Sequence, residues 1–449
     1  MEVAILFGSF ALLLILRVPI GISLGMSSLI AIFSSGVVQP TYLAQGLVTG
    51  ADSFPLMAVP FFVLAGELMA TGGISRRLLN IADAFLGRKY GGLALVTVVA
   101  CMFFAAISGS GPATVAAIGG LTIPSMLKQG YDKNFASAIT AAAGSIGVII
   151  PPSIPMVMYC VATGASVGAL FMAGFIPGIL IGVSLCLYSS WYCKKHGYIN
   201  QDAASFSWGN VGYALKDGVW ALLVPIIILG GIYGGIFTPT EAAAVAVAYG
   251  LVVGLFVYRD LKPNDLYRIF ASAALTTATI LIILGTATTF GRILTLERVP
   301  MVIADFFESV TDSRIVLLML INILLLIVGC FMETNAAIII LAPIFLPIVE
   351  AMGVDPVHFG IIMVVNLAIG FVTPPLGVNL FVACNVANAK LEQICKGIVP
   401  ILGVMIVDLL LITYWKPCPC SCPACSTDYF SNRTVPGTAK AVPDTFCCF

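Results

Sequence analysis

Long apolar runs separated by short polar or Gly- and Pro-rich steps fill nearly the whole chain, from Val3 to Trp415. A helix that crosses a membrane needs about 20 predominantly apolar residues. The chain has room for roughly ten to twelve crossings, although several runs are too short to span alone. We therefore predict an all-α, polytopic membrane protein. Its first run is expected to be retained as a helix, because no basic segment precedes it.

The short runs form two pairs that predict hairpins. Residues 92–127 are divided by a Gly-rich turn at 108–112, and residues 315–349 are divided at 333–335. Two half-length helices can meet at mid-depth only where protein surrounds the bare turn between them. Each pair is therefore predicted to be a re-entrant hairpin, which enters the membrane and leaves on the same side.

Two further segments, 135–170 and 360–388, are each interrupted by a Pro-Pro step. The steps are Pro151-Pro152 and Pro374-Pro375. Proline cannot donate the backbone hydrogen bond that continues a helix, and each segment is long enough for one span in two pieces. We predict two discontinuous helices.

The Pro-Pro steps lie 223 residues apart, and other residues recur at the same offset. The matched pairs are Pro124 with Pro347, Gly130 with Gly353, Asp132 with Asp355, Gly147 with Gly370 and Pro177 with Pro400. Ordinary helix kinks, the alternative interpretation, would not recur in register. The sequence therefore predicts a duplicated unit, with one copy in residues 1–200 and the other in residues 215–416.

The basic residues predict how the two copies are oriented. An external N-terminus places fifteen of the 21 Lys and Arg residues on the cytoplasmic side, in agreement with the positive-inside rule. The same placement puts the base of the first hairpin inside and that of the second outside. Such inverted-topology repeats are typical of secondary transporters, whose broken helices form the substrate and ion site near the midplane.

Composition excludes several classes of function. Only 9% of residues are charged, 60% are hydrophobic and the formal net charge is zero, which leaves no basic surface for nucleic acid and no room for a soluble catalytic domain. No phosphate-binding loop is present, so a gradient rather than ATP is expected to drive any pumping. The two histidines lack the neighbours of a metal or catalytic site, and neither enzyme activity nor a cofactor is expected.

Oxygen atoms without helical partners at the turns and breaks are candidate ligands for sodium. Hard cations prefer such oxygens, and each hairpin turn is expected to enclose one ion together with the break of its own half. The candidate sodium ligands are Ser108, Ser110, Gly147, Ile150 and Ser153 in the first half and Thr334, Asn335, Gly370, Thr373 and Gly377 in the second.

Helix N-termini at the same places would attract an anion, because their free N–H groups carry a positive partial charge. No Lys or Arg lies in the four segments, so a bound carboxylate would rely on these groups and on co-bound cations. The candidate substrate-binding residues are Gly111, Ala113, Pro152, Glu333, Ala336, Pro375 and Asn379. The structural alternative for each Ser, Thr and Asn is a hydrogen bond that ties helices together.

Three acidic residues remain within apolar runs, namely Glu67, Glu333 and Asp408. Intramembrane carboxylates are functional candidates by default. Glu333, on a hairpin turn, is expected to bind an ion or a proton or to seal a gate. Glu67 is expected to reach the interface or to pair with Arg76 and Arg77, and Asp408 is expected to contact another part of the protein.

Two segments differ from the spans in composition. Residues 74–90 have the pattern of an amphipathic surface helix, with 300–310 as its external counterpart, and both are expected to act as hinge arms or surface anchors. Residues 417–449 are rich in Cys, Pro, Ser and Thr. This tail is expected to be disordered or non-native, with disulfides or a soft-metal site as the alternatives.

The chain resembles the large membrane subunit of the tripartite ATP-independent periplasmic (TRAP) transporters over residues 1–415. The resemblance rests on SGSGPAT at 108–114, IIPPS at 149–153, FTPTEAA at 237–243 and VTPPLGVN at 372–379. The Cys-rich tail departs from the family's pattern, so nothing is carried over to it.

The resemblance implies an ion-transporter-superfamily fold with an elevator mechanism in the bacterial inner membrane. It implies sodium-coupled import of an organic acid, such as a C4-dicarboxylate or sialic acid, delivered by an extracytoplasmic solute-binding protein. A small four-helix membrane subunit is expected as a separate chain, because no such segment precedes residue 1. The alternatives are a stand-alone carboxylate symporter or cation/proton exchanger, and a passive channel, against which two occluding hairpins argue.

Overall fold

The computed structural model describes residues 2–35, 39–86, 89–198, 207–310, 313–375 and 377–415, and the tail 417–449 lies outside them. All of the regular elements in these residues are helices. Eight helical stretches among them are long and apolar enough to cross a membrane. The prediction of an all-α polytopic membrane protein is confirmed.

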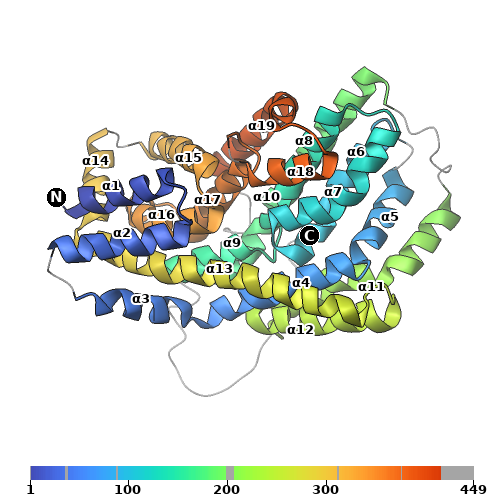
Figure 1. Cartoon of the computed structure of the whole chain (residues 1–449). Coiled ribbons are helices and arrows are strands. Elements are labelled where there is room, and N and C mark those ends of the chain that lie inside the picture. Colours follow the sequence, from blue (N-terminus) through green and yellow to red (C-terminus); the bar gives the residue numbers. More distant parts are fainter. Residues whose placement is uncertain are drawn as a thin grey trace, which may run out of the picture.

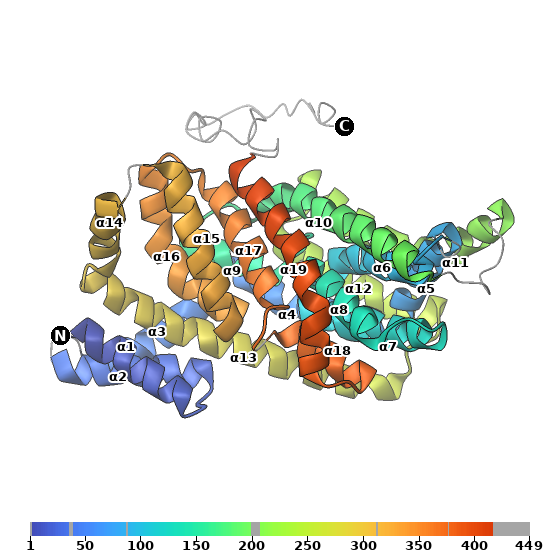
Figure 2. The same ribbon diagram turned by 90° about the horizontal axis from the view of Figure 1, so that it is seen from above.

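One group of helices is built around the long helix α13, Pro263–Leu296, which crosses the lower part of Figure 2 in yellow. Helices α2, α3 and α4 pack along α13, and α12 packs on α4. The other members of this α13 group are α1 Glu2–Ile15, α2 Ile20–Ser35, α3 Thr41–Ala51, η1 Phe54–Met57, α4 Ala58–Thr71, α11 Trp208–Tyr233, α12 Pro239–Val252 and η3 Val253–Val257.

A second group of helices, the hairpin group, contains the segments for which hairpins and breaks are predicted (Figure 1). Its first half comprises α6 Gly92–Ser108, α7 Gly111–Lys128, α8 Lys133–Ser145, η2 Ile146–Val148, α9 Ile154–Thr163 and α10 Val167–His196. Its second half comprises α15 Arg314–Phe331, α16 Thr334–Ala351, α17 Pro356–Gly370, α18 Val378–Ala387 and α19 Leu391–Tyr414. Across the halves, α9 packs on α16 and α18 packs on α7.

Helix is interrupted at both Pro-Pro steps. Between α8 and α9 the chain passes through the short turn η2, and the Ser153 side chain then caps α9 by accepting a hydrogen bond from the Met156 N–H. The first broken helix ends earlier than the predicted residue 170. Gly164, with φ of +79°, closes α9, and Ser166 starts the separate helix α10.

The hairpin arms end within two residues of the predicted apolar runs, but they are longer than half of a membrane span. Helix α6 has 17 residues, and α7, α15 and α16 have 18 each. Eighteen residues of α-helix rise about 27 Å, close to the thickness of a membrane core. The half-length expectation is therefore wrong, and the re-entrant path of each hairpin stays a prediction.

Two short helices connect the α13 group with the hairpin group. Helix α5, Ile74–Leu86, packs on α11 and on α6. Helix α14, Val299–Val310, packs on α13 and on α16. This bridging position suits the predicted role of hinge arms.

A cluster of charges fastens the start of α5 to the α13 group. The Arg77 guanidinium donates to the Asp260 carboxylate at 2.6 Å and lies 3.5 Å from the Asp217 carboxylate. It also stacks over the Tyr258 ring at 3.6 Å from the centroid. The Arg77 side chain is only 11% exposed, whereas that of Arg76, which also binds Asp260, is 59% exposed.

Arg77→Ala is expected to lower the free energy of unfolding by about 2 kcal/mol, because it removes a nearly buried guanidinium that contacts Asp260, Asp217 and the Tyr258 ring together. Arg76→Ala is the matched control, and its exposed ion pair is expected to contribute less than about 1 kcal/mol. Thermal unfolding of the two purified variants measures the difference. Equal losses in both would show that Arg77 has no special part in fastening α5.

Candidate functional site

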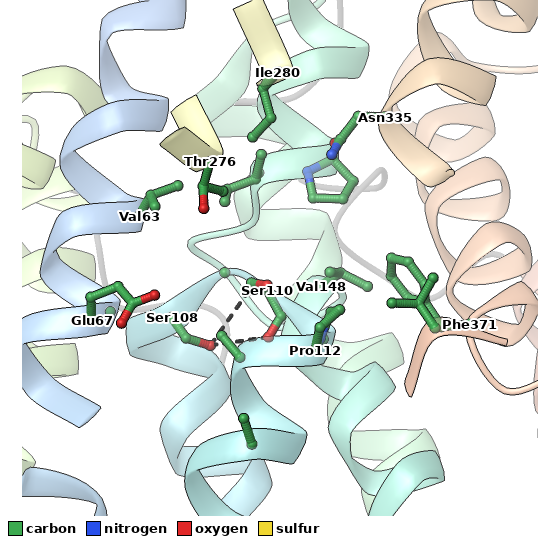
Figure 3. Close-up of a pocket in the computed structure, with 18 of the residues that line it drawn as sticks. Val63, Glu67, Ser108, Ser110, Pro112, Val148, Thr276, Ile280, Asn335 and Phe371 are labelled. Atoms are coloured by element: carbon green, nitrogen blue, oxygen red, sulfur yellow. Dashed lines mark hydrogen bonds between the residues drawn. The ribbon is translucent and has the colours of Figure 1, made fainter. Parts of the chain in front are cut away.

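A cavity of about 680 Å³ lies where both hairpin turns meet α4 and α13. Figure 3 shows Ser108 and Ser110 of the first turn below it, Asn335 of the second turn above it, and Glu67 of α4 at one side. Predicted site residues in its lining are Ser108, Ser110, Gly111, Ala113, Glu333 and Asn335. The structure therefore brings the two turns to one space, although their sequences lie more than 200 residues apart.

The first turn lies directly against the first break. The Ile154 N–H, at the start of α9, donates to the Gly109 carbonyl at 3.3 Å. Gly109 adopts φ of +61°, and a Cβ there would lie 2.8 Å from the Pro152 carbonyl oxygen. Glycine is needed at this position both for its backbone conformation and for the close approach.

Three oxygen atoms gather at the first turn. The hydroxyls of Ser108 and Thr114 are 2.9 Å apart, and the Thr114 hydroxyl donates to the Ser110 carbonyl at 2.7 Å. Gly147 of η2 lies beside them, because its Cβ would be 2.7 Å from the Ser110 carbonyl oxygen. Ser108 and Thr114 are 2% and 0% exposed, so this oxygen cluster is shielded from water.

Thr114 was not among the residues that the sequence singled out for the site. It stands four residues after Ser110, a spacing at which a threonine hydroxyl in a helix reaches the preceding carbonyl. That spacing was visible in the SGSGPAT motif and could have identified it.

The other predicted residues of the first break are buried and lie outside the cavity lining. The Ser153 hydroxyl donates to the Val148 carbonyl at 2.6 Å and accepts from the Met156 N–H at 3.3 Å. Ile150 and Pro152 are buried in the break. The contacts of Ser153 correspond to the structural alternative, in which its hydroxyl holds the break in shape.

In the second half, turn and break also touch. The Thr334 hydroxyl lies 3.5 Å from the Leu367 carbonyl, and Gly370 packs against the backbone of Gly329 in α15. The Thr373 hydroxyl donates to the Ile369 carbonyl at 2.8 Å. The remaining predicted residues lie in the following turn, with Gly377 buried at φ of +42° and Pro375 exposed.

Asn379 connects the two halves. Its side-chain amide, fully buried in α18, donates to the Ala141 carbonyl of α8 at 3.1 Å. Its Oδ1 atom accepts no hydrogen bond from the described residues and lies 3.1 Å from the place where a Cβ of Gly111 would stand. The start of α7 therefore lies against a buried amide oxygen from the other half.

The N-termini of α7 and α16 are occupied differently. Glu333 caps α16, because its carboxylate accepts from the Ala336 N–H at 3.1 Å and from the Asn335 amide at 2.7 Å. Ser110, at the equivalent place before α7, makes no side-chain cap. The first N–H groups of α7 have no helical acceptor and border the cavity at Gly111 and Ala113.

The expectation that Glu67 pairs with Arg76 and Arg77 is wrong. Both arginines bind Asp260. This aspartate follows α12 and η3 and lies about 190 positions after Glu67 in the sequence. Glu67 instead lines the cavity and accepts a hydrogen bond from the Ser272 hydroxyl of α13 at 3.1 Å. Asp408 contacts another helix, as expected, because it accepts from the Ser184 hydroxyl of α10 at 2.8 Å.

The cavity is acidic. Its lining, which belongs wholly to the described part of the chain, contains Glu67 and Glu333 but no Lys, Arg or His. Thr276 and Thr279 of α13 add two hydroxyl groups that sequence reasoning missed. An organic anion in this space would meet two carboxylates and only the partial charges of hydroxyls and N–H groups.

Comparison with known proteins gives the family. The model of the tripartite ATP-independent periplasmic transporter, DctM component, matches residues 7–418. The chain is 55% identical to the isethionate TRAP transporter permease protein DctMQ of Oleidesulfovibrio alaskensis over 92% of its own length, and spans 65% of that relative. It is 39% identical to the C4-dicarboxylate TRAP transporter large permease protein DctM of Rhodobacter capsulatus, covering 92% of this chain and 97% of the relative.

A further relative is the sialic acid TRAP transporter large permease protein SiaM of Vibrio cholerae, 40% identical over 89% of this chain and 93% of that protein. Among solved structures, the YdaH transporter of Alcanivorax borkumensis superposes with a TM-score of 0.58 at 16% identity, covering 83% of this chain and 88% of that chain. That likeness concerns the fold alone. The chain belongs to the DctM component family of the tripartite ATP-independent periplasmic transporters.

Proposed function

We propose that the chain is the large permease subunit of a sodium-coupled importer of organic acids, which receives its substrate from an extracytoplasmic solute-binding protein. Relatives are named for a C4-dicarboxylate, for sialic acid and for isethionate. All three substrates are organic anions, so the proposed cargo is a small organic carboxylate or a related acid.

The observation that carries this proposal is the acidic lining of the cavity. Glu67 and Glu333 and no basic side chain line the space, so an anion entering alone would find no compensating positive charge. Cations bound nearby would supply it. The binding of cation and anion would then depend on each other, which is the requirement for symport.

The two turn-and-break pairs are the proposed sodium sites. In the first half, Ser108, Thr114 and the Ser110 carbonyl supply oxygens within hydrogen-bond distance of one another. In the second half, Thr334 and the carbonyls around Gly370 supply the equivalent set. A sodium ion would replace the hydrogen bonds that these oxygens make to each other.

The N-terminus of α7 is the proposed anchor for the substrate's acid group. It borders the cavity and is not capped by a side chain. The equivalent terminus of α16 already holds the Glu333 carboxylate. A substrate anion would therefore bind N–H groups on the first half, while Glu333 supplies negative charge to a cation near the second turn.

The packing of the hairpin group supports an inverted repeat that moves as one body. Helix α18 of the second half packs on α7 of the first, and α9 of the first packs on α16 of the second. These two contacts are equivalent under the predicted duplication. In the proposed elevator mechanism the hairpin group moves relative to the α13 group, with α5 and α14 as the connecting arms.

The proposed setting is the bacterial inner membrane with an external N-terminus. The proposed partners are a small four-helix membrane subunit and a solute-binding protein. Two of the relatives are named as large permease proteins, which supports a membrane complex with a second, smaller subunit.

Reconstitution distinguishes the proposal from a stand-alone symporter. The chain and the proposed small membrane subunit are placed in proteoliposomes. The proposed solute-binding protein is added outside, together with the labelled acid that this binding protein retains. Uptake is expected only when the binding protein is present. Equal uptake without it would favour the stand-alone carrier, and conduction without a sodium gradient would favour a channel.

A further inference from the structure

A second cavity, of about 610 Å³, lies away from the acidic cavity, between α6, α10 and α11. We call it the lateral cleft. Its walls are almost entirely apolar and include Leu95, Met102 and Phe103 of α6, Phe175 of α10 and Leu229 of α11. None of the oxygen and N–H groups in the proposed sodium sites and substrate anchor belongs to its lining.

The lateral cleft is as long as one leaflet of a bilayer. Helices α6 and α10 run antiparallel along it, because Gly91 lies against Cys193 while Gly182 lies against Met102. On α6 the lining runs from Leu95 to Ala106, a rise of about 17 Å at 1.5 Å per residue. Half of a hydrocarbon core about 30 Å thick has nearly the same length.

Only one end of the lateral cleft is polar. Lys89 and Ser190 line that end, and the opposite end closes on Ile150 beside the first Pro-Pro step. Lys89 is exposed and makes no ion pair with an acidic side chain of the described residues. A cation at the polar end of an apolar cleft complements a molecule with an anionic head group and an aliphatic tail.

We propose that the lateral cleft binds one acyl chain of an anionic phospholipid, whose phosphate group lies at Lys89. A single acyl chain is thin enough and gains free energy for each methylene that it buries. The site is a binding site for lipid and does not depend on the identity of the transported acid.

Native mass spectrometry of the purified full chain tests the site, with dioleoylphosphatidylglycerol as the anionic probe and dioleoylphosphatidylcholine as the zwitterionic one. The first is expected to bind more tightly. Lys89→Gln is expected to weaken its binding roughly fivefold, the effect of one basic residue near a membrane surface, and to leave phosphatidylcholine unchanged. The matched control is Lys194→Gln, which removes an exposed lysine outside the cleft lining.

A second variant fills the lateral cleft. Val183, 48% exposed, lines it, whereas Ile176, 45% exposed on the same helix, does not. Val183→Trp is expected to abolish the tightly bound phosphatidylglycerol, and Ile176→Trp is expected to retain it. If Val183→Trp does not fold, Lys89→Gln still decides the test.

Three results would overturn the lipid site. The first is equal affinity for the two lipids, and the second is a pair of cleft variants that bind phosphatidylglycerol as tightly as their controls. The third is a co-purified polypeptide that occupies the cleft. It would protect Cys186, in the cleft lining, from thiol labelling after all lipid has been removed.

Discussion

Thr114→Ala is expected to raise the sodium concentration for half-maximal uptake by about tenfold, because losing one ligand oxygen costs on the order of 1–3 kcal/mol. The Thr114 hydroxyl joins Ser108 to the Ser110 carbonyl at the first turn. Removal of this oxygen leaves the proposed ion with an incomplete set of ligands. The measurement is initial uptake into proteoliposomes over a series of sodium concentrations at constant ionic strength.

Two variants serve as controls for this prediction. Thr114→Ser keeps the hydroxyl and is expected to retain most of the sodium affinity. Thr97→Ala removes a buried threonine on α6 of the same hairpin, whose hydroxyl donates to the Leu93 carbonyl, and is expected to leave sodium dependence unchanged. If Thr114→Ala and Thr97→Ala behave alike, the oxygen cluster at the first turn does not hold the coupling ion.

Gly370→Ala is expected to reduce uptake to less than about a tenth of the unaltered rate, because overpacking of this size costs about 1–3 kcal/mol. A Cβ on Gly370 would lie 2.6 Å from the Gly329 carbonyl oxygen and 2.8 Å from its Cα. Both atoms belong to backbone and cannot move aside as a side chain can. The end of α17 would have to separate from α15, which displaces the proposed second sodium site.

Gly120→Ala is the matched control for Gly370→Ala. Gly120 lies within α7, and a Cβ there would meet nothing within 4 Å. The added methyl group is expected to stabilise the helix by about 0.5–1 kcal/mol without loss of uptake. Transport by Gly370→Ala at the control rate would show that the contact between α15 and α17 does not shape the site.

The interruptions of the helices were predictable from local chemistry. Proline lacks the N–H group that a continuous helix needs, and glycine accepts the backbone conformation of a tight turn. The first turn therefore falls at Gly109, between α6 and α7, and the breaks fall at Pro151-Pro152 and Pro374-Pro375. The end of α9 was predicted less well, because the apolar run continues through Gly164 into α10.

The contribution of the α13 group to the cavity was not predictable from local patterns. Glu67 reaches Ser272, and shares the cavity lining with Thr276 and Thr279, only because α4 packs on α13, a contact between segments about 200 positions apart. The nearby arginines Arg76 and Arg77 suggested a local ion pair for Glu67. Aspartates from distant segments bind those arginines instead, and this leaves Glu67 at the cavity.

The central claim is that an anion enters the acidic cavity only together with sodium. It is tested most directly by measuring uptake of the labelled acid, with the solute-binding protein present, while external sodium is replaced by choline at constant ionic strength. The account predicts that uptake falls to the level of empty liposomes, because the cavity then holds no positive charge to compensate that of the substrate. Uptake that continues at its full rate in choline would contradict it.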